Sequence, residues 1–393
     1  MAAQFLKLDN MADRHGVSPG RRRITVPRQA TARAPEMYGY RIGAGPARGG
    51  AMPFDRYEMA IPAFVLGAAI VWWAGVRLPR YVAVLSDRTG WGQGLAGMVV
   101  LGGITSLPEL ATGTSAAALD APLLSLNDIL GSASLNLLLL AIADSAIGAK
   151  PLTSVVARPI TLIQGVLGMM MFGVLGLAIG VGEPDFGLPV GLWASLILAG
   201  VIITLMVADR SEKHPRWQVT NPPPDELAEQ DGVEAMSDAR MWLALVLLAA
   251  MILAGGMLLA SAGEAIARQS DFGLAPVGFL LVAAATSLPE ASAITGAMRA
   301  QRYQLAVGEI FGSNLFNLAI IFMIDLVAPG APVLAQAGMF EMAAAMLALL
   351  LTGLFVVGLI ERRDRTVLRM GEDSIAVILL YATGTVLLLV AAR

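Results

Sequence analysis

The chain has 393 residues, of which 56% are hydrophobic and only 15% are charged, and its mean hydropathy is +0.68. Soluble domains carry about 25% charged residues. Cysteine is absent, and the two histidines lie in polar stretches, so disulfides and thiolate metal sites are excluded and a histidine-based site is not expected. Repeated apolar runs of about twenty residues are typical of membrane-spanning helices. The composition therefore predicts a membrane protein with many spans.

About ten apolar spans follow one another along the chain, and a polar stretch at 208–240 divides them five and five. This stretch holds three consecutive prolines at 222–224 and an acidic run, which is typical of a linker. The sequence thus predicts an all-α membrane protein with a first transmembrane half at 52–207 and a second at 241–393. The predicted spans are 58–76, 92–119, 122–143, 157–181, 187–207, 241–266, 272–298, 304–327, 332–360 and 373–392.

Lysine and arginine orient the spans, because they are retained on the cytoplasmic side. They gather after the odd-numbered spans, whereas the opposite loops hold only Arg268, with Arg56 and Arg393 at the two ends. The linker is therefore expected in the cytoplasm. The basic residues after odd-numbered spans are Arg77, Arg80, Arg88, Lys150, Arg158, Arg210, Lys213, Arg216, Arg240, Arg299, Arg302, Arg362, Arg363, Arg365 and Arg369.

Residues 1–51 disagree with this orientation, because they are basic and yet precede a span that begins on the outside. They are rich in Gly, Ala and Pro and lack the apolar run of a secretory signal. Two interpretations stay open: translation begins at Met52, or the segment is a disordered basic arm.

The pentapeptide Thr-Ser-Leu-Pro-Glu occurs twice inside apolar spans, and it ends at Glu109 and at Glu290. The same offset of 181 positions relates further polar residues, without a gap from Thr105 to Asn136. An odd number of crossings separates the two copies, so they enter the membrane in opposite directions. Inverted repeats with interrupted helices are typical of secondary transporters, whose sites lie at the repeat interface.

Each copy brings oxygen atoms to the middle of the membrane. Its proline lacks an N–H and leaves carbonyls of the preceding turn without helical partners. Hydroxyl groups of Thr105, Ser106, Thr286 and Ser287 lie one turn before the glutamates. On the next span, Asp128, Ser132 and Asn136 are spaced four apart, as are Glu309, Ser313 and Asn317. Each step of four advances about 40° around a helix, so each triplet forms one polar stripe.

Every lysine and arginine is assigned to a loop, a span end or a tail, so none is available to neutralise these acids. A carboxylate at the bilayer centre costs about 2.5–3.5 kcal/mol, so four unpaired ones would cost on the order of 10 kcal/mol. The acids are therefore expected to hold protons or to receive cations from solution. Oxygen ligands favour hard ions such as Ca²⁺ and Na⁺ over soft transition metals.

Simpler interpretations exist for single features. A proline in a membrane helix is usually a kink, small residues usually allow close packing, and one buried glutamate can pair with backbone. These interpretations must hold at equivalent positions of both halves, which favours an ion site. Asp144, Glu264, Asp325 and Glu341 lie near span ends or in late spans, and they are interpreted as facing water, a helix end or another subunit.

The strings "GITSLPE" with "GSASLN", and "AATSLPE" with "GSNLFN", resemble the two α-repeats of the cation/Ca²⁺ antiporter superfamily, which includes the Na⁺/Ca²⁺ exchangers. The resemblance implies that Glu109 and Glu290 are paired Ca²⁺ carboxylates. It also implies ion-coordinating roles for Ser132, Asn136, Ser313 and Asn317, Na⁺-ligating roles for Thr105, Ser106, Thr286 and Ser287, and backbone carbonyls from Gly102 and Ala283.

This sequence departs from the family pattern at four positions. Ala133 stands where the motif often has asparagine, Asp128 and Glu309 replace a residue that is commonly asparagine, and Asn317 stands where potassium-dependent members carry aspartate. Potassium coupling is therefore not expected, whereas the two extra acids leave open extra sodium ions or coupling to protons.

The sequence predicts a secondary-active antiporter in a bacterial inner membrane that exchanges Ca²⁺ for Na⁺ by alternating access at this metal site. The alternative is a cation/H⁺ antiporter that uses the same site. The expected partners are inorganic cations and the lipid bilayer, without nucleic acid or a resident cofactor, and the oligomeric state is left open. An intramembrane acid protease would need neighbouring aspartates and no symmetric stripes, so an enzyme is not expected. A channel would move one ion without a counter-ion.

Overall fold

A segment in hydrocarbon must satisfy its backbone N–H and C=O groups internally, which favours helices. The structure, a computed structural model, is accordingly helical over most of the residues it describes. These are residues 57–391 except 148–149, 157, 185, 188–189, 215–232, 234 and 268–276, and the side chains of residues 57, 58, 264, 277, 278 and 281 are not described. The predicted extension 1–51 and most of the predicted linker lie outside them. Contacts divide the chain into Met1–Gly49 and Gly50–Arg393, and only the second unit is described below.

The first half begins with a long apolar helix and contains one interrupted span. The elements are α1 (Tyr57–Gly75), α2 (Leu78–Thr89), α3 (Gln93–Ala96), the π-helix η1 (Gly97–Leu101), α4 (Gly102–Thr105), α5 (Leu107–Ala118), α6 (Pro122–Asp144), α7 (Leu152–Val155), α8 (Pro159–Val181) and α9 (Leu192–Lys213). Three of these helices, α2, α6 and α8, have no side-chain hydrogen bond at the N-cap. Each has proline at its first or second position, where the missing N–H has no helical partner to lose.

The second half repeats this plan and adds a short hairpin before its last helix. Strand β1 (Thr366–Val367) pairs antiparallel with β2 (Met370–Gly371). The helices are α10 (Asp238–Ala267), the π-helix η2 (Val277–Val282), α12 (Ala283–Thr286), α13 (Leu288–Arg299), α14 (Tyr303–Val327), α15 (Val333–Gln336), α16 (Met339–Glu361) and α17 (Glu372–Ala391).

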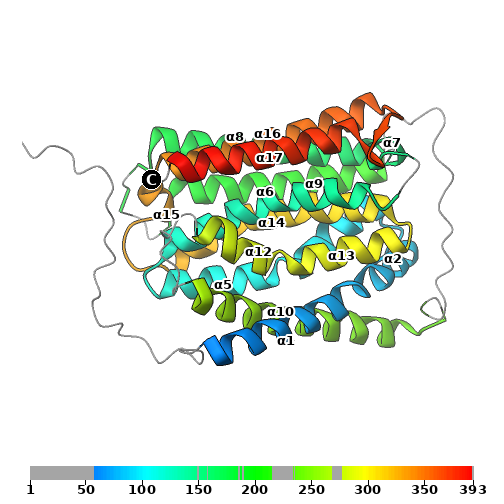
Figure 1. The fold of residues 1–393 in the computed structure, drawn as a ribbon, viewed down its shortest axis with the longest axis horizontal. Helices are drawn as coiled ribbons and strands as arrows, with labels where there is room; N and C mark the ends of the chain where they lie inside the picture. The colour runs from blue at the N-terminus through cyan, green and yellow to red at the C-terminus, as the bar shows by residue number, and fades with distance from the viewer. Residues whose placement is uncertain are drawn as a thin grey trace, which may run out of the picture. The chain divides into compact units, whose positions relative to one another are not determined.

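The offset of 181 positions, found in the sequence over one motif pair, holds for the whole architecture. It carries α4, α5 and α7 residue for residue onto α12, α13 and α15, and it carries the first residues of α1 and α6 onto those of α10 and α14. Helices related by the offset also pack on one another: α1 on α10, α6 on α14 and α8 on α16. In Figure 1, α1 and α10 lie side by side along one edge, and α6 and α14 lie between them and α8, α16 and α17. The predicted fold of two inverted repeats is confirmed.

Eight helices in the described residues are long and apolar enough to cross a membrane. The broken pair Gln93–Thr105 and Leu107–Ala118, bent by 43°, makes a ninth candidate. Of the predicted span 272–298, only the part from Val277 onward is described. One difference concerns α2, because residues 78–89 were predicted to be part of a loop. Leu78, Val82 and Leu85 are buried while Arg88 lies near the surface, so α2 is an amphipathic helix.

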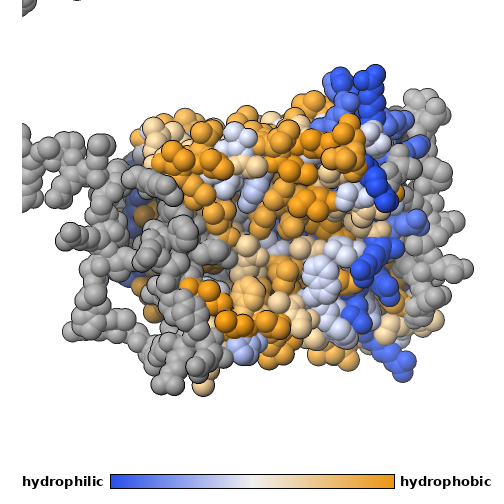
Figure 2. All heavy atoms as spheres, in the orientation of Figure 1, coloured by the Kyte–Doolittle hydropathy of each residue, from blue (hydrophilic) through white to orange (hydrophobic). Residues whose placement is uncertain are grey.

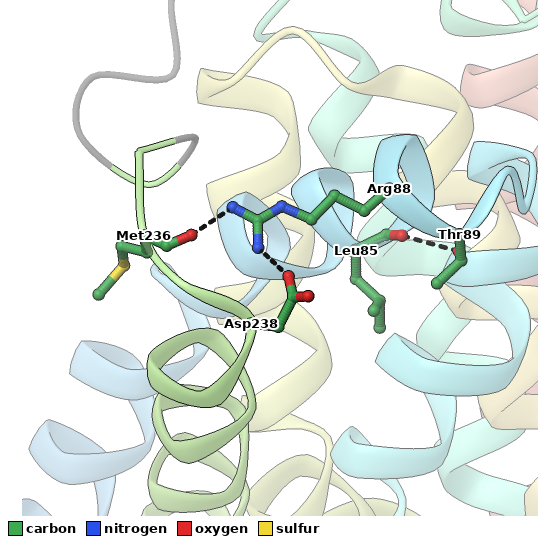
Figure 3. Close-up of polar contacts among 5 residues, drawn as sticks. All are labelled: Leu85, Arg88, Thr89, Met236 and Asp238. Carbon is green, nitrogen blue, oxygen red and sulfur yellow. Dashed lines mark hydrogen bonds and ion pairs between the residues drawn. The ribbon is translucent and has the colours of Figure 1, made fainter.

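Hydrophilic residues gather at one end of the face seen in Figure 2, the end at which Figure 1 shows α2 and α7. At this end Arg88 of α2 binds the start of α10 (Figure 3). Its guanidinium donates to Asp238 Oδ1 at 2.5 Å and to the Met236 carbonyl at 2.6 Å. The sequence places Asp238 in the acidic linker, but it is the first residue of α10. A carboxylate at this position is stabilised by the positive end of the helix dipole.

Asp144 and Asp325, which the offset also relates, close the last turns of α6 and α14. Asp144 accepts hydrogen bonds from the N–H groups of Leu152 at 2.5 Å and Gly371 at 2.7 Å. Asp325 accepts from those of Val333 at 2.7 Å and Gly191 at 2.9 Å. Each carboxylate thus joins a central helix to the short helix eight residues later and to the start of an outer helix.

We expect Asp325→Asn to lower the free energy of unfolding by about 1–3 kcal/mol, because an amide has one acceptor oxygen and leaves one buried N–H without a partner. Thermal unfolding of the purified protein in detergent measures the change. Asp364→Asn, at an exposed position, is the control and is expected to leave the unfolding temperature unchanged. Equal unfolding temperatures for both variants would contradict the structural role of Asp325.

Candidate ion-binding site

The two interrupted spans are built alike around a serine. A π-helix leads into a single α-turn, α4 or α12, which stops at Ser106 (φ −81°, ψ 1°) or Ser287 (φ −80°, ψ 6°). The next helix, α5 or α13, then begins with Leu-Pro-Glu, and proline is tolerated in that first turn because no N–H is needed there. The pentapeptide therefore fixes a break in each repeat, with the glutamate in the first turn after it.

Glycine brings each break close to a central helix. A Cβ at Gly131 of α6 would lie 2.1 Å from the Phe279 carbonyl oxygen, and one at Gly312 of α14 would lie 2.2 Å from the Met98 carbonyl oxygen. The two contacts are related by the offset. The glycine of "GSASLN" or "GSNLFN" is thus required for the backbone of an interrupted span from the other repeat to approach.

All predicted site residues are buried, with exposed fractions of 3% or less. They come from the breaks and from the central helices of both halves. They are Thr105, Ser106, Glu109, Asp128, Ser132, Asn136, Thr286, Ser287, Glu290, Glu309, Ser313 and Asn317.

Two threonine–carboxylate bonds cross between the repeats. Thr105 Oγ1 lies 3.1 Å from Glu309 Oε1, and Thr286 Oγ1 lies 2.9 Å from Asp128 Oδ1. Each threonine precedes a break in one repeat, and each acid belongs to the central helix of the other. The two acids that depart from the family pattern therefore lie against the breaks.

Glu290 is held by a chain of hydroxyl groups, whereas Glu109 is not. Ser313 Oγ donates to Glu290 Oε1 at 2.8 Å. Because its proton is used in that bond, Ser313 accepts from Ser106 Oγ at 3.0 Å, and it also lies 3.4 Å from Asn136 Nδ2. The equivalent bond from Ser132 to Glu109 is not made, and Ser132 contacts Thr286 at 3.2 Å instead.

Oxygen atoms without hydrogen-bond partners concentrate at these residues. In the described part of the chain, buried side-chain atoms that lack a partner include both carboxylate oxygens of Glu109, Glu290 Oε2 and Glu309 Oε2. A buried polar group without a partner costs about 1–3 kcal/mol, and a charged one costs more. The same holds for Asn136 Oδ1, Ser287 Oγ, and Asn317 Oδ1 and Nδ2. This donor set suits a hard cation.

The four carboxylates have no basic partner among the described residues. None of the ion pairs found there includes these acids. No three acidic or histidine side chains of the described residues come together as a metal cluster.

Asn314 belongs to this network and was missed in the sequence. Its Oδ1 accepts from Asn136 Nδ2 at 3.0 Å, and its Nδ2 donates to the Ala133 carbonyl at 3.2 Å. The offset relates Asn314 to Ala133, so the asparagine binds the backbone of its own counterpart. The signal was present, because "GSNLFN" holds an asparagine where "GSASLN" has Ala133.

The lower-ranked acids lie elsewhere. Asp144 and Asp325 bind backbone, as described above. Glu341 accepts from Asn127 Nδ2 at 2.9 Å and from the N–H of Gly338 at 2.8 Å, so it closes the start of α16, as one of the interpretations expected. The side chain of Glu264 is outside the described residues.

A comparison of the sequence with known protein families gives a match over most of the chain. The family model described as "Sodium/calcium exchanger protein" matches residues 59–218 and 240–390, which cover both halves. The chain belongs to the sodium/calcium exchanger family. The predicted resemblance is confirmed, and with it a multi-span membrane protein of an antiporter family.

Two relatives of the family are similar over most of their length. The protein named "Putative antiporter CaxA" of Alkalimonas amylolytica is 28% identical over 304 residues, which cover 74% of this chain and 89% of that protein. The inner membrane protein YrbG of Escherichia coli K12 is 26% identical over 275 residues, 69% of this chain and 81% of that protein.

The fold matches solved structures of the sodium-calcium exchanger NCX_Mj. In crystals soaked with 100 mM Na⁺ and 10 mM Sr²⁺, that protein has a TM-score of 0.61 to this chain at 18% identity, over 84% of this chain and 98% of the other. Crystals soaked without Na⁺ and Ca²⁺ give the same TM-score. At this identity, the match establishes the fold and not the ion.

Proposed function

We propose that the protein exchanges Ca²⁺ for Na⁺ across the membrane by alternating access at the buried carboxylate site. The observation that carries the proposal is the pair Glu109 and Glu290. Both are fully buried and have unpartnered oxygens, and neither takes part in an ion pair found among the described residues. A carboxylate pair needs either one divalent cation or two monovalent ones to become neutral. Both kinds of ion therefore compete for the same oxygens.

Charge also explains why exchange is favoured over leakage. An empty site with ionised acids carries a charge that is costly inside a membrane. Closing the site to water is thus expected to require a bound ion on each crossing, because only occupied states are near neutral. The hydroxyl groups of Thr105, Ser106, Thr286 and Ser287 would supply ligands for Na⁺, and Ser132, Asn136, Ser313 and Asn317 for either ion.

A cation/H⁺ antiporter is the alternative, and a specific observation supports it. Asp128 and Glu309 are buried acids beyond the central pair, each held by a threonine of the other repeat. Protons on these acids would neutralise the site as sodium ions would. The two candidates use the same residues and differ in the ion that drives exchange.

The placement in the cell is part of the proposal. The relative in Escherichia coli is an inner membrane protein by name, and the basic loops support a cytoplasmic linker. We infer a bacterial inner membrane protein whose partners are inorganic cations and lipid and which needs no resident cofactor.

Radioactive Ca²⁺ uptake into proteoliposomes tests the proposal. Vesicles loaded with Na⁺, vesicles with a pH gradient and vesicles without a gradient are compared for the wild-type chain. We expect uptake above the no-gradient level only with the Na⁺ gradient, because Na⁺ leaving the site must be replaced by Ca²⁺. Uptake driven only by the pH gradient would establish the alternative. Absence of Ca²⁺ movement under both gradients would overturn the choice of Ca²⁺, and equal uptake in all three would indicate a channel.

A further inference from the structure

Two glycines of the outer helices α1 and α10 pack on the broken spans next to the two central glutamates. A Cβ at Gly256 of α10 would lie 2.4 Å from Pro108 Cγ and 2.5 Å from Pro108 Cβ. A Cβ at Gly75, the last residue of α1, would lie 1.8 Å from Ser292 Oγ, 2.8 Å from Ser292 Cβ and 3.3 Å from the Pro289 carbonyl oxygen. Contacts under 3.0 Å require the neighbouring atoms to move.

The offset of 181 positions relates these contacts to each other. It carries Gly75 onto Gly256 and Pro108 onto Pro289. Each glycine lies against the opposite repeat near its break, although the atoms differ: Gly256 meets the Pro108 ring, and Gly75 meets Ser292 and, at 3.3 Å, the Pro289 carbonyl oxygen. An unrelated pair of helix-packing glycines would not be expected to meet equivalent prolines.

Helices α1 and α10 pack closely against each other, and together they contact both breaks. A Cβ at Gly67 of α1 would lie 2.8 Å from the Gly255 carbonyl oxygen of α10, so the backbones of the two helices cross closely. Gly256 follows directly in α10, and it faces Pro108. A single helix pair thus contacts the segment before Glu109 and the segment around Glu290.

Each of the two prolines is joined to a central glutamate by one peptide bond. Pro108 precedes Glu109 and Pro289 precedes Glu290, and a planar trans peptide keeps consecutive Cα atoms 3.8 Å apart. A displacement of either proline therefore carries the glutamate with it. Ser292 adds a second connection on α13, because its hydroxyl donates to the Pro289 carbonyl at 2.7 Å and lies 3.4 Å from the Val71 carbonyl of α1.

We propose that Gly75 and Gly256 are positioning residues that let the α1–α10 pair set the places of the Glu290 and Glu109 carboxylates and thereby the cation affinity of the site. This inference rests on the proposed function, since it concerns the same carboxylates. It adds two residues that carry no polar side chain and that lie outside both sequence motifs.

The experiment measures the Ca²⁺ concentration for half-maximal uptake, the maximal rate and the unfolding temperature for Gly75→Ala and Gly256→Ala. We expect the half-maximal concentration to rise about tenfold, since overpacking displaces the neighbouring atoms, while maximal rate and unfolding temperature change less. Gly168→Ala is the matched control: Gly168 lies in α8, and nothing lies within 4 Å of its added Cβ. That variant is expected to match the wild type.

A second substitution separates positioning from loss of stability. Ser292→Gly removes both atoms that the new Cβ at position 75 would meet below 3.0 Å. The double variant Gly75→Ala/Ser292→Gly is therefore expected to regain most of the affinity lost in Gly75→Ala, relative to Ser292→Gly alone. If Gly256→Ala does not fold, this pair decides the question.

The outcomes distinguish the two proposals. A wild-type protein without Ca²⁺ uptake refutes the proposed function. An active wild type, with glycine variants whose half-maximal concentration equals that of Gly168→Ala, overturns the positioning role. A lower unfolding temperature without a change in affinity overturns it as well.

Discussion

Replacing Glu290 or Glu109 by glutamine is expected to abolish Ca²⁺ exchange and to leave the fold intact. Glutamine keeps the shape of the side chain and removes its charge. A Ca²⁺ ion held by the remaining carboxylate would keep a net positive charge inside the membrane, which costs about 2.5–3.5 kcal/mol. Each 1.4 kcal/mol is a factor of ten in affinity, so Ca²⁺ binding is expected to weaken by about a hundredfold. Ca²⁺ uptake and binding in proteoliposomes measure the loss.

The unfolding temperature gives a second readout: the same substitution that weakens Ca²⁺ binding is expected to stabilise the ion-free protein. Glu109 is fully buried, and both of its carboxylate oxygens lack a hydrogen-bond partner. Without Ca²⁺, Glu109→Gln is therefore expected to unfold at a higher temperature than the wild type, and Ca²⁺ is expected to stabilise the wild type alone. Glu341→Gln is the control, because Glu341 is also buried but binds Asn127 and Gly338 away from the site. Full Ca²⁺ uptake by Glu109→Gln would refute the role of that residue.

Neutralising the additional acids is expected to change the number of driving ions. In Asp128→Asn and Glu309→Gln, the new amide oxygen still accepts the threonine bond, while one negative charge is lost. If a monovalent cation compensates that charge in the wild type, each variant should exchange about one fewer Na⁺ or H⁺ per Ca²⁺, since an uncompensated buried charge is strongly unfavourable. The Ca²⁺ gradient reached at equilibrium, plotted against the imposed Na⁺ or H⁺ gradient, gives this ratio.

Thr286→Val is the matched control for this second prediction. It removes the hydroxyl that binds Asp128 and keeps the carboxylate charge. We expect it to lower affinity and to leave the ratio of exchanged ions unchanged. An unchanged ratio in both Asp128→Asn and Glu309→Gln would show that these acids are structural and do not carry a driving ion.

The equivalence of residues could be predicted from the sequence, because the pentapeptide and its offset are explicit there. The offset predicted opposite directions of entry and the two polar stripes, and the fold confirms the repeat. Which equivalent residues touch one another could not be predicted. Thr105 and Glu309 lie 204 positions apart, and their contact depends on how the two halves pack around Gly131 and Gly312.

Two further features, the carboxylate–backbone bonds and the π-helices, could not be predicted from the sequence, each for its own physical reason. Asp144 and Asp325 look like acids at span ends, and only the folded chain brings the N–H groups of Gly371 and Gly191 to them. The π-helices η1 and η2 are composed of ordinary apolar residues, so no pattern of side chains predicts them. Both lie one α-turn before a break, and π-helical turns often occur at functional sites.

The two central glutamates differ, because Glu290 accepts a hydrogen bond from a serine and Glu109 does not. This difference has a consequence for the second state that alternating access requires. Under the proposed alternating access, the inverted repeats predict the other access state: positions n and n + 181 are expected to exchange their conformations. Ser313 now binds Glu290 while Ser132 binds Thr286 and leaves Glu109 free. After the exchange, Ser132 would hold Glu109, while Ser313 would contact Thr105 and leave Glu290 free. We therefore expect a different glutamate to be free to bind an ion in each access state: Glu109 in the one described here, and Glu290 in the one open to the other side of the membrane.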